Sequence, residues 1–330
     1  MEPSLLALSG IADVAAWHRS WCHRLDSAPL GTAELLSRLQ PTMLWNVALP
    51  MLERLRAEAG AGRRPLLALN GPVGAGKSSL TRCLSALGPQ LGLRLTVASI
   101  DDAYLPWEAR CRAMAGNPFG VSRVPPGSHD TALLQARLSR WKDGGPLKLP
   151  RFDKTLRGGE GDRCGETTHQ ADAVVLEGWL LGCRSLGASL PVALEQADHH
   201  PQLATLTAEE KLWLPRWDEA LAAYAPLGDP GHGLVDALWV LHPTAWNLPM
   251  RWRLQAEARQ RSGGGGALRA EAVIAIVRAT LAALPPSLYQ DPLLEWSDAV
   301  AVLDGRRRCI SSWCPAAGQS SASESSPRTG

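Results

Sequence analysis

The stretch Asn70-Gly71-Pro72-Val73-Gly74-Ala75-Gly76-Lys77-Ser78-Ser79 decides the fold of this chain of 330 residues. It matches the pattern G-x-x-x-x-G-K-[ST], follows a short apolar run over 65–69 that is typical of a buried strand, and opens a helical pattern. The glycines let the backbone turn its N–H groups inward around phosphate oxygens, and the following helix adds its positive N-terminal end. The stretch therefore predicts a phosphate-binding loop, whose natural ligand is a nucleoside triphosphate.

Two side chains of this loop have predicted roles in binding ATP and Mg²⁺. Lys77 is expected to reach the β- and γ-phosphates, and the Ser78 hydroxyl is expected to bind the magnesium ion that bridges them. A chance glycine-rich turn is the alternative, and the strand, loop, helix and lysine in register argue against it. The predicted nucleotide-binding residues are Gly71, Gly74, Ala75, Gly76, Lys77, Ser78 and Ser79.

The rest of the chain alternates short apolar runs with helical patterns, which predicts an α/β fold. Runs at 93–100, 173–176, 237–241 and 299–303 are expected to join 65–69 in a mostly parallel central sheet, between two helical layers, as in P-loop NTPases. The predicted parts are a helical N-terminal extension (1–60), a kinase-type P-loop domain (61–310) with a helical insertion (190–230) and a helical lid (246–266), and a disordered tail (311–330).

Acidic residues follow two of the predicted strands, at the carboxyl ends where ligands of open α/β sheets bind. Asp101 is the predicted base that orients an acceptor hydroxyl and accepts its proton, with Asp102 as the alternative base, a substrate contact or a group near magnesium. Glu177 ends the apolar strand 173–176, as the acid of a Walker-B strand does, and is predicted to act on the metal through water. A carboxylate that is merely solvated at a strand end is the alternative for Glu177.

Two further polar segments are candidates for binding the second substrate. In 123–130, prolines and a glycine precede His129 and Asp130, and Asp130 is either a helix N-cap, a substrate ligand or both. The loop 150–163 gathers cations that suit a carboxylate, although a solvated loop is the alternative. The predicted substrate-binding residues are Asp102, Tyr104, His129, Asp130, Arg151, Asp153, Lys154 and Arg163.

The segment 246–266 combines an arginine-rich helical pattern with a glycine run, which is typical of a mobile lid. Arginines on a closing segment stabilise charge on the transferred phosphoryl group and exclude water. The predicted lid residues are Arg251, Arg253 and Arg259, and a solvated helix face is the alternative for any one of them.

Composition argues against several classes of partner. The formal net charge of +2 offers no strong basic field for nucleic acid or anionic lipid, and no apolar stretch approaches the roughly 20 residues of a membrane span. The start of the chain has no pattern of a targeting signal, and the seven cysteines include no C-x-x-C pair. We therefore expect a cytoplasmic protein that acts on a small molecule, while the sequence says nothing of its oligomeric state.

Four segments resemble the glycerate 3-kinases of plants and cyanobacteria and their fungal relatives, within the phosphoribulokinase and uridine kinase group. They are 71–78, 99–105 (SIDDAYL), 150–163 (PRFDKTLRGGEGDR) with 126–130 (PGSHD), and 174–180 (VVLEGWL). The resemblance implies phosphorylation of D-glycerate to 3-phosphoglycerate with ATP and Mg²⁺, a step of photorespiratory carbon recovery. It also implies Asp101 as the base, Asp130 as a contact of acceptor hydroxyls and Glu177 as the Walker-B acid. Ser128 and Val124 depart from the expected threonine and glycine.

Other functions stay open at this point. The acceptor could be uridine, pantothenate or ribulose 5-phosphate, since a cationic loop serves a phosphate as well as a carboxylate. A nucleotide-driven switch is less favoured, because no asparagine opens the N-K-x-D pattern of guanine-reading proteins. A nucleic-acid-dependent ATPase would need stacking aromatics along a basic track, which the dispersed tryptophans do not suggest.

Overall fold

The computed structural model of the chain describes residues 3–197, 199–262 and 269–315. Within them, the central sheet has the strand order β2-β5-β1-β6-β7-β8, and only β8 runs antiparallel, against β7. The five parallel strands are those predicted from the sequence, so the predicted α/β fold with its mostly parallel sheet is confirmed. The strands are β1 (Leu66–Asn70), β2 (Leu95–Ser99), β5 (Ala173–Gly178), β6 (Ala237–Pro243), β7 (Ala299–Leu303) and β8 (Cys309–Trp313).

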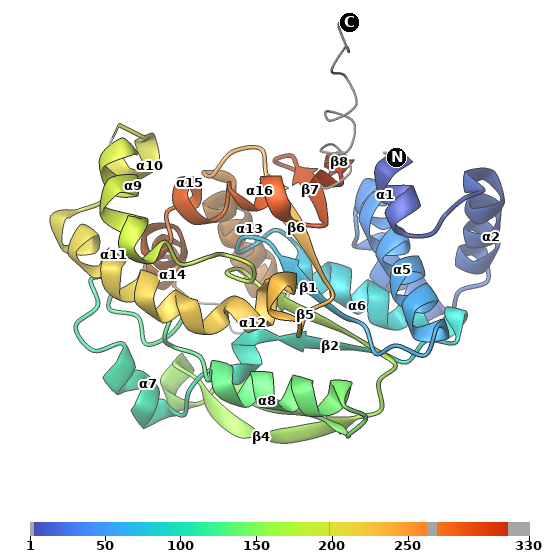
Figure 1. The fold of residues 1–330 in the computed structure, drawn as a ribbon, viewed down its shortest axis with the longest axis horizontal. Helices are drawn as coiled ribbons and strands as arrows, with labels where there is room; N and C mark the ends of the chain where they lie inside the picture. The colour runs from blue at the N-terminus through green and yellow to red at the C-terminus, as the bar shows by residue number, and fades with distance from the viewer. Residues whose placement is uncertain (1–2, 198, 263–268, 316–330) are drawn as a thin grey trace, which may run out of the picture.

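Helices cover both faces of this sheet and make the three layers visible in Figure 1. One face packs against α1 (Pro3–Leu8), α2 (Val14–Asp26), α3 (Leu30–Ser37), α4 (Pro41–Met43), the π-helical turn η1 (Leu44–Ala48), α5 (Leu49–Gly60), α6 (Lys77–Leu87) and α13 (Leu248–Ser262). The other packs against η3 (Ile100–Ala103), α8 (Thr131–Lys142), α12 (Ala225–Gly228), α14 (Ala270–Ala283), α15 (Pro286–Tyr289) and α16 (Leu293–Trp296). The remaining helices are η2 (Gly88–Leu91), α7 (Trp107–Ala113), η4 (Arg157–Gly159), η5 (Gly187–Ser189), α9 (Leu190–Gln196), α10 (Pro201–Ala204), α11 (Ala208–Leu221), η6 (Ala222–Tyr224) and η7 (Pro230–His232).

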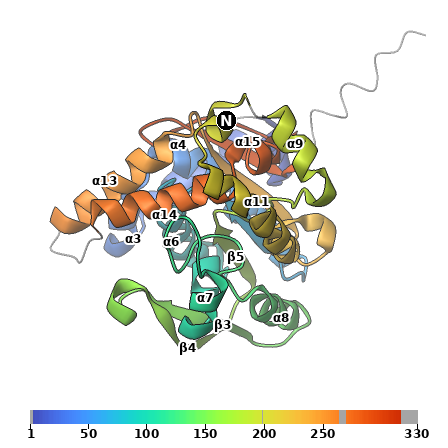
Figure 2. The same ribbon diagram turned by 90° about the vertical axis from the view of Figure 1, so that its left-hand side faces the viewer.

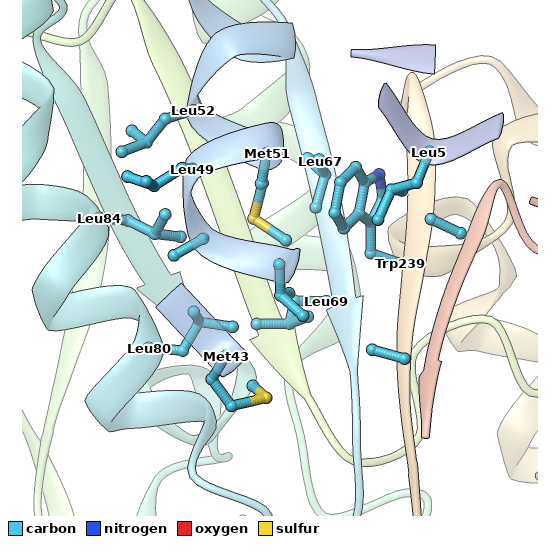
Figure 3. Packing of buried hydrophobic residues seen from close by; sticks show 14 of the residues in the cluster. Leu5, Met43, Leu49, Met51, Leu52, Leu67, Leu69, Leu80, Leu84 and Trp239 are labelled. Carbon is cyan, nitrogen blue, oxygen red and sulfur yellow. The ribbon is translucent and has the colours of Figure 1, made fainter. Parts of the chain in front are cut away.

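Both faces of the parallel strands are buried, which explains their continuous apolar sequences. Alternate residues of β1 point to opposite sides, so that Leu67 and Leu69 join the core under α5 and α6 while Leu66 and Ala68 join the core under α8 and α12. Figure 3 shows Leu67 and Leu69 packed among Leu49, Met51 and Leu52 of α5, Leu80 and Leu84 of α6, and Trp239 of β6. Both faces of β1 are therefore packed by helices up to the end of the strand, where the phosphate loop begins.

The predicted N-terminal extension is helical, and it belongs to this core. Leu49, Met51 and Leu52 of α5 are fully buried against the sheet, and the indole of Trp21 in α2 donates a hydrogen bond of 2.9 Å to Glu53. Burying three such aliphatic side chains contributes on the order of 5 kcal/mol or more. Helices α1 to α5 thus form a large part of one layer of the domain.

Two parts of the sheet structure differ from the sequence-based prediction. A hairpin of β3 (Leu147–Asp153) and β4 (Asp162–His169) stands apart from the central sheet, beside α7 and α8, as Figure 2 shows. The disordered tail does not begin at residue 311 as predicted, because 311–313 pair with β7 as part of β8. The remainder of the tail, 316–330, and the glycine run at 263–266 lie outside the described residues.

In the described part of the chain no single helix has the length and apolar composition to cross a membrane. Only the pair made by 270–283 and 286–296, bent by 43° between them, reaches that composition when the two are taken together.

Candidate active site

The phosphate loop lies where β1 ends and α6 begins. Gly74 and Gly76 have φ of 78° and 96°, a left-handed conformation that glycine adopts without strain. The Nζ of Lys77 donates hydrogen bonds to the carbonyl oxygens of Gly71 (2.6 Å) and Pro72 (3.2 Å) and lies 3.9 Å from Glu177 Oε2. Burial lowers the pKa of Lys77, while Glu177 and Asp101 act in the opposite direction. The lysine is thus held over the loop, beside the two acids.

A cleft of about 470 Å³ opens over this loop and is large enough for a nucleotide. Residues 74–79 line one side of it, and Arg251, Arg253 and Arg259 of α13 line another, so the three predicted lid arginines all face the loop. The segment 38–40 with Met43 and the turn 305–307 complete the walls. No sequence pattern had indicated that the N-terminal helices contribute to the nucleotide cleft.

Helix α13 packs directly on the phosphate loop. A methyl group at Gly74 would lie 2.7 Å from Cβ of Trp252 and 3.0 Å from the backbone nitrogen of Arg253. The guanidinium of Arg307 joins the two elements, because its Nε donates to the carbonyl of Gly74 (2.6 Å) and its Nη2 to that of Trp252 (2.9 Å). Any movement of α13 therefore acts on the phosphate loop at once.

The residues predicted on the metal side lie together. Ser78 Oγ donates to Glu177 Oε1 at 3.4 Å, and the strand register sets Glu177 opposite Ser99 of β2. Asp102 lines the same hollow as Ser78 and Glu177, and burial together with Asp101 raises its pKa to about 6. These hard oxygen donors fit Mg²⁺. The described residues contain no group of three or more His, Cys, Asp or Glu that could hold a metal.

A second, smaller hollow lies between the phosphate loop and the β3–β4 hairpin. Its volume of about 120 Å³ is well below the roughly 300–1,000 Å³ of sites for drug-sized ligands. A nucleoside or pantothenate therefore fits it poorly, and a three- or four-carbon acceptor suits it better. The polar and aromatic side chains around it are Lys77, Ser99, Asp101, Tyr104, Arg123, Lys154, Glu177, Trp179, Arg253 and Thr280.

Asp101 is the central carboxylate of this hollow. Its Oδ2 accepts a hydrogen bond of 2.8 Å from Lys154 Nζ, and its Oδ1 accepts one of 3.0 Å from the hydroxyl of Tyr104. Burial alone would raise the pKa of Asp101, but Lys154 and His129 outweigh it and hold the pKa well below the ordinary value. Asp101 is therefore ionised at neutral pH and held by two donors in one orientation.

His129 lies behind Asp101, buried and stacked on the Tyr104 ring at a centroid distance of 4.2 Å. Its Nδ1 is 2.9 Å from the hydroxyl of Tyr224, which also accepts a hydrogen bond from the backbone of Gly127. The Tyr224 hydroxyl has one proton, which it can donate to Nδ1, so the imidazole proton is then on Nε2. That buried Nε2 has no hydrogen-bond partner among the described residues and lies 3.9 Å from Asp101 Oδ1. His129 thus faces the carboxylate rather than the hollow.

The other predicted substrate residues lie outside this hollow. Asp130 caps α8, accepting from the backbone nitrogen of Leu133 at 3.1 Å, and also pairs with Arg163 at 2.9 Å. Arg163 holds the carbonyl of Tyr104 as well (2.8 Å). Arg151 is exposed on β3, and Asp153 forms a local turn with Thr155. Lys154 is the one residue predicted from this loop that lines the hollow, and Asp102 lies on the metal side.

Sequence reasoning missed Ser99, Arg123, Trp179 and Thr280 as residues of the hollow. Arg123 begins the polar segment 123–130, but one arginine among many carried no signal of its own. Trp179 directly follows the strand that ends at Gly178, so its position at the carboxyl edge of the sheet was the available signal.

Comparison with known proteins agrees with the predicted resemblance. The chain is 27% identical over 267 residues to the chloroplastic D-glycerate 3-kinase of Arabidopsis thaliana, which covers 76% of this chain and 54% of that protein. It is 35% identical over 130 residues to a probable ATP-dependent kinase of Saccharomyces cerevisiae, which covers 34% of the chain and 44% of the relative. No family model matches the chain.

A solved structure shows the same fold. The D-glycerate 3-kinase of Cryptococcus neoformans superposes with a TM-score of 0.70 at 24% identity, over 82% of this chain and 99% of the other. The chain spans only about half the length of the Arabidopsis relative.

Proposed function

We propose that this protein is an ATP-dependent kinase that phosphorylates D-glycerate to 3-phosphoglycerate. The observation that carries the proposal is the position of Lys77 and Asp101 around one small hollow beside the phosphate loop. A γ-phosphate held by Lys77 would face an acceptor hydroxyl held by Asp101. Similarity to the Arabidopsis D-glycerate 3-kinase supports this acceptor, and the small volume of the hollow supports a short molecule.

Asp101 would act mainly by orientation. Because its pKa is held low, the ionised carboxylate accepts a hydrogen bond from the acceptor hydroxyl and takes its proton as the bond to phosphorus forms. Phosphoryl transfer needs little more than such positioning and neutralisation of the charge on the phosphoryl oxygens. Lys154 and Tyr104 keep Asp101 in place.

Lys77 and Arg253 are the chain's own contributions on the phosphate side. Both line the nucleotide cleft and the acceptor hollow, so both can reach a phosphoryl group that passes between them. Ser78 and Glu177 are the residues that would hold Mg²⁺, which neutralises phosphate charge when bound. Helix α13 would exclude water from the cleft above them.

A coupled ATP assay with D-glycerate, uridine, pantothenate and ribulose 5-phosphate tests the proposal. We expect the phosphorylation rate with D-glycerate to exceed the rates with the other three acceptors by a wide margin, and ³¹P NMR to identify 3-phosphoglycerate as the product. Asp101→Asn should lose about 10²- to 10⁴-fold in kcat while still binding Mg-ATP. Preference for another acceptor, or rapid ATP hydrolysis without any acceptor, would refute the assignment. A cytoplasmic location and a role in photorespiratory salvage are proposed with it, on the sequence and the resemblance.

A further inference from the structure

The cations around the acceptor hollow differ in how they are paired. Lys154 pairs with Asp101 at 2.8 Å, Lys77 lies 3.9 Å from Glu177, and Arg253 pairs with Glu257. Arg123 is only 9% exposed, yet no carboxylate of the described residues lies within ion-pair distance of it. A buried guanidinium needs an anion or several hydrogen-bond acceptors: the fully buried Arg110 has three backbone carbonyl acceptors, whereas Arg123 has one among the described residues, which leaves room for an anionic ligand.

The Arg123 side chain is fixed at one end and free at the other. Its Nη1 donates a hydrogen bond of 2.9 Å to the carbonyl of Glu160, whereas its Nη2 and Nε donate no hydrogen bond to any of the residues that the structure describes. Those two nitrogens form one edge of the planar guanidinium, the fork that matches both oxygens of a carboxylate. Because Arg123 lines the hollow, this edge is available to a ligand there.

The backbone directly after Arg123 is strained. Val124 has φ of 97°, which is a genuine outlier for a β-branched residue and costs on the order of 1–3 kcal/mol. The Val124 side chain is 7% exposed and packs into the core under α8, which maintains this conformation. Val124 also lines the hollow, so this strained backbone forms part of its wall beside Arg123.

We propose that Arg123 binds the carboxylate of the acceptor, so that the site selects small hydroxy acids over neutral polyols. This inference rests on the proposed function, since the acceptor hydroxyl is placed at Asp101. A short hydroxy acid would then lie across the hollow, with its carboxylate at Arg123 and its hydroxyl at Asp101. The exposed arginine of the neighbouring hairpin, Arg151, does not line it.

Arg123→Gln tests this assignment, with Arg123→Lys as a second variant and Arg112→Gln as the control. Arg112 is an exposed arginine of α7 that lines neither cleft, so its replacement makes the same charge change outside the site. Steady-state kinetics would use D-glycerate and glycerol, the neutral analogue without a carboxylate. Thermal melting would confirm folding, and the shift of the melting temperature with D-glycerate would report binding without turnover.

We expect Arg123→Gln to raise KM for D-glycerate about 10- to 100-fold, since hydrogen bonds to a charged group of this kind contribute that much. KM for ATP and kcat/KM for glycerol should stay as in the unmodified protein, and Arg123→Lys should give an intermediate KM. Equal losses with D-glycerate and glycerol, or no change with either, would overturn the inference. If the unmodified protein does not phosphorylate D-glycerate, the proposed function fails. The role of Arg123 is then still decided by the rise in melting temperature that small carboxylates cause: its loss in Arg123→Gln supports the inference, and its persistence overturns it.

Discussion

Replacing Gly74 by alanine tests whether α13 packs on the phosphate loop as the structure shows. Gly74 has φ of 78°, where an alanine costs about 1–2 kcal/mol, offset in part by about 0.4–1 kcal/mol from the less flexible unfolded chain. The new Cβ would also lie 2.7 Å from Cβ of Trp252. Trp252 is fully buried and cannot move aside without displacing α13.

The expected cost of this contact follows from a matched comparison. Gly92 has a similar φ of 65° and is exposed, and a methyl group added to it would meet no described atom within 4 Å, so Gly92→Ala carries the backbone cost alone. Gly74→Ala adds the overpacking cost, typically about 1–3 kcal/mol. We therefore expect Gly74→Ala to unfold with about 2 kcal/mol less free energy than Gly92→Ala, or roughly 3 °C lower in Tm.

Urea denaturation and thermal melting of the two variants measure this difference. Because Arg253 follows Trp252 on the displaced helix and lines both clefts, Gly74→Ala should also raise KM for ATP, whereas Gly92→Ala should not. Equal stability of the two variants would refute the packing argument, and it would mean that α13 lies away from the loop when ATP is absent.

Two further predictions concern the buried polar groups. Asp102→Asn should stabilise the magnesium-free protein at pH 8 by about 1–2 kcal/mol and about half as much at pH 5, in urea denaturation at both pH values. The substitution stabilises because the pKa of Asp102 is about 6 in the folded protein and about 3.8 in the unfolded chain, so the free energy of unfolding falls as pH rises between these values. A stabilisation that does not depend on pH would contradict this reasoning. Tyr224→Phe removes the nearer of the two partners of His129 Nδ1, the other being Ser128 Oγ, and also removes the partner of the Gly127 amide; it should lower stability by about 2–4 kcal/mol with a smaller loss of kcat. An unchanged Tm would show that water replaces the hydroxyl.

The central sheet was predictable because its strands carry their own signal. Strands buried on both faces read as continuous apolar runs, and the five predicted runs became β1, β2, β5, β6 and β7. The β3–β4 hairpin was missed because Pro150 lies inside β3, and a proline argues against a strand. The last strand, β8, is short and partly polar, and it precedes a tail rich in serine, so the composition of this region predicted disorder rather than a strand.

The two halves of the site also differ in how well the sequence predicts them. The phosphate loop is contiguous in sequence, so its spacing alone places Lys77 and Ser78. The acceptor hollow is built by side chains from distant segments, with Asp101 after β2, Lys154 beyond β3 and Trp179 after β5. Only three-dimensional pairing shows that Lys154 has a carboxylate partner at 2.8 Å while Arg123 has none among the described residues.

Pairing of charges is therefore the information that the fold adds to the sequence. In the loop 150–163 the sequence offered several cations as candidates, and the structure leaves Arg151 in solvent and assigns Arg163 to the cap of α8. Arg163 lies outside the hollow, and its charge is already paired with Asp130, which a ligand would have to displace. Counting cations in a motif overestimates the substrate site, whereas among the described cations that line the acceptor hollow Arg123 is the one without a carboxylate partner.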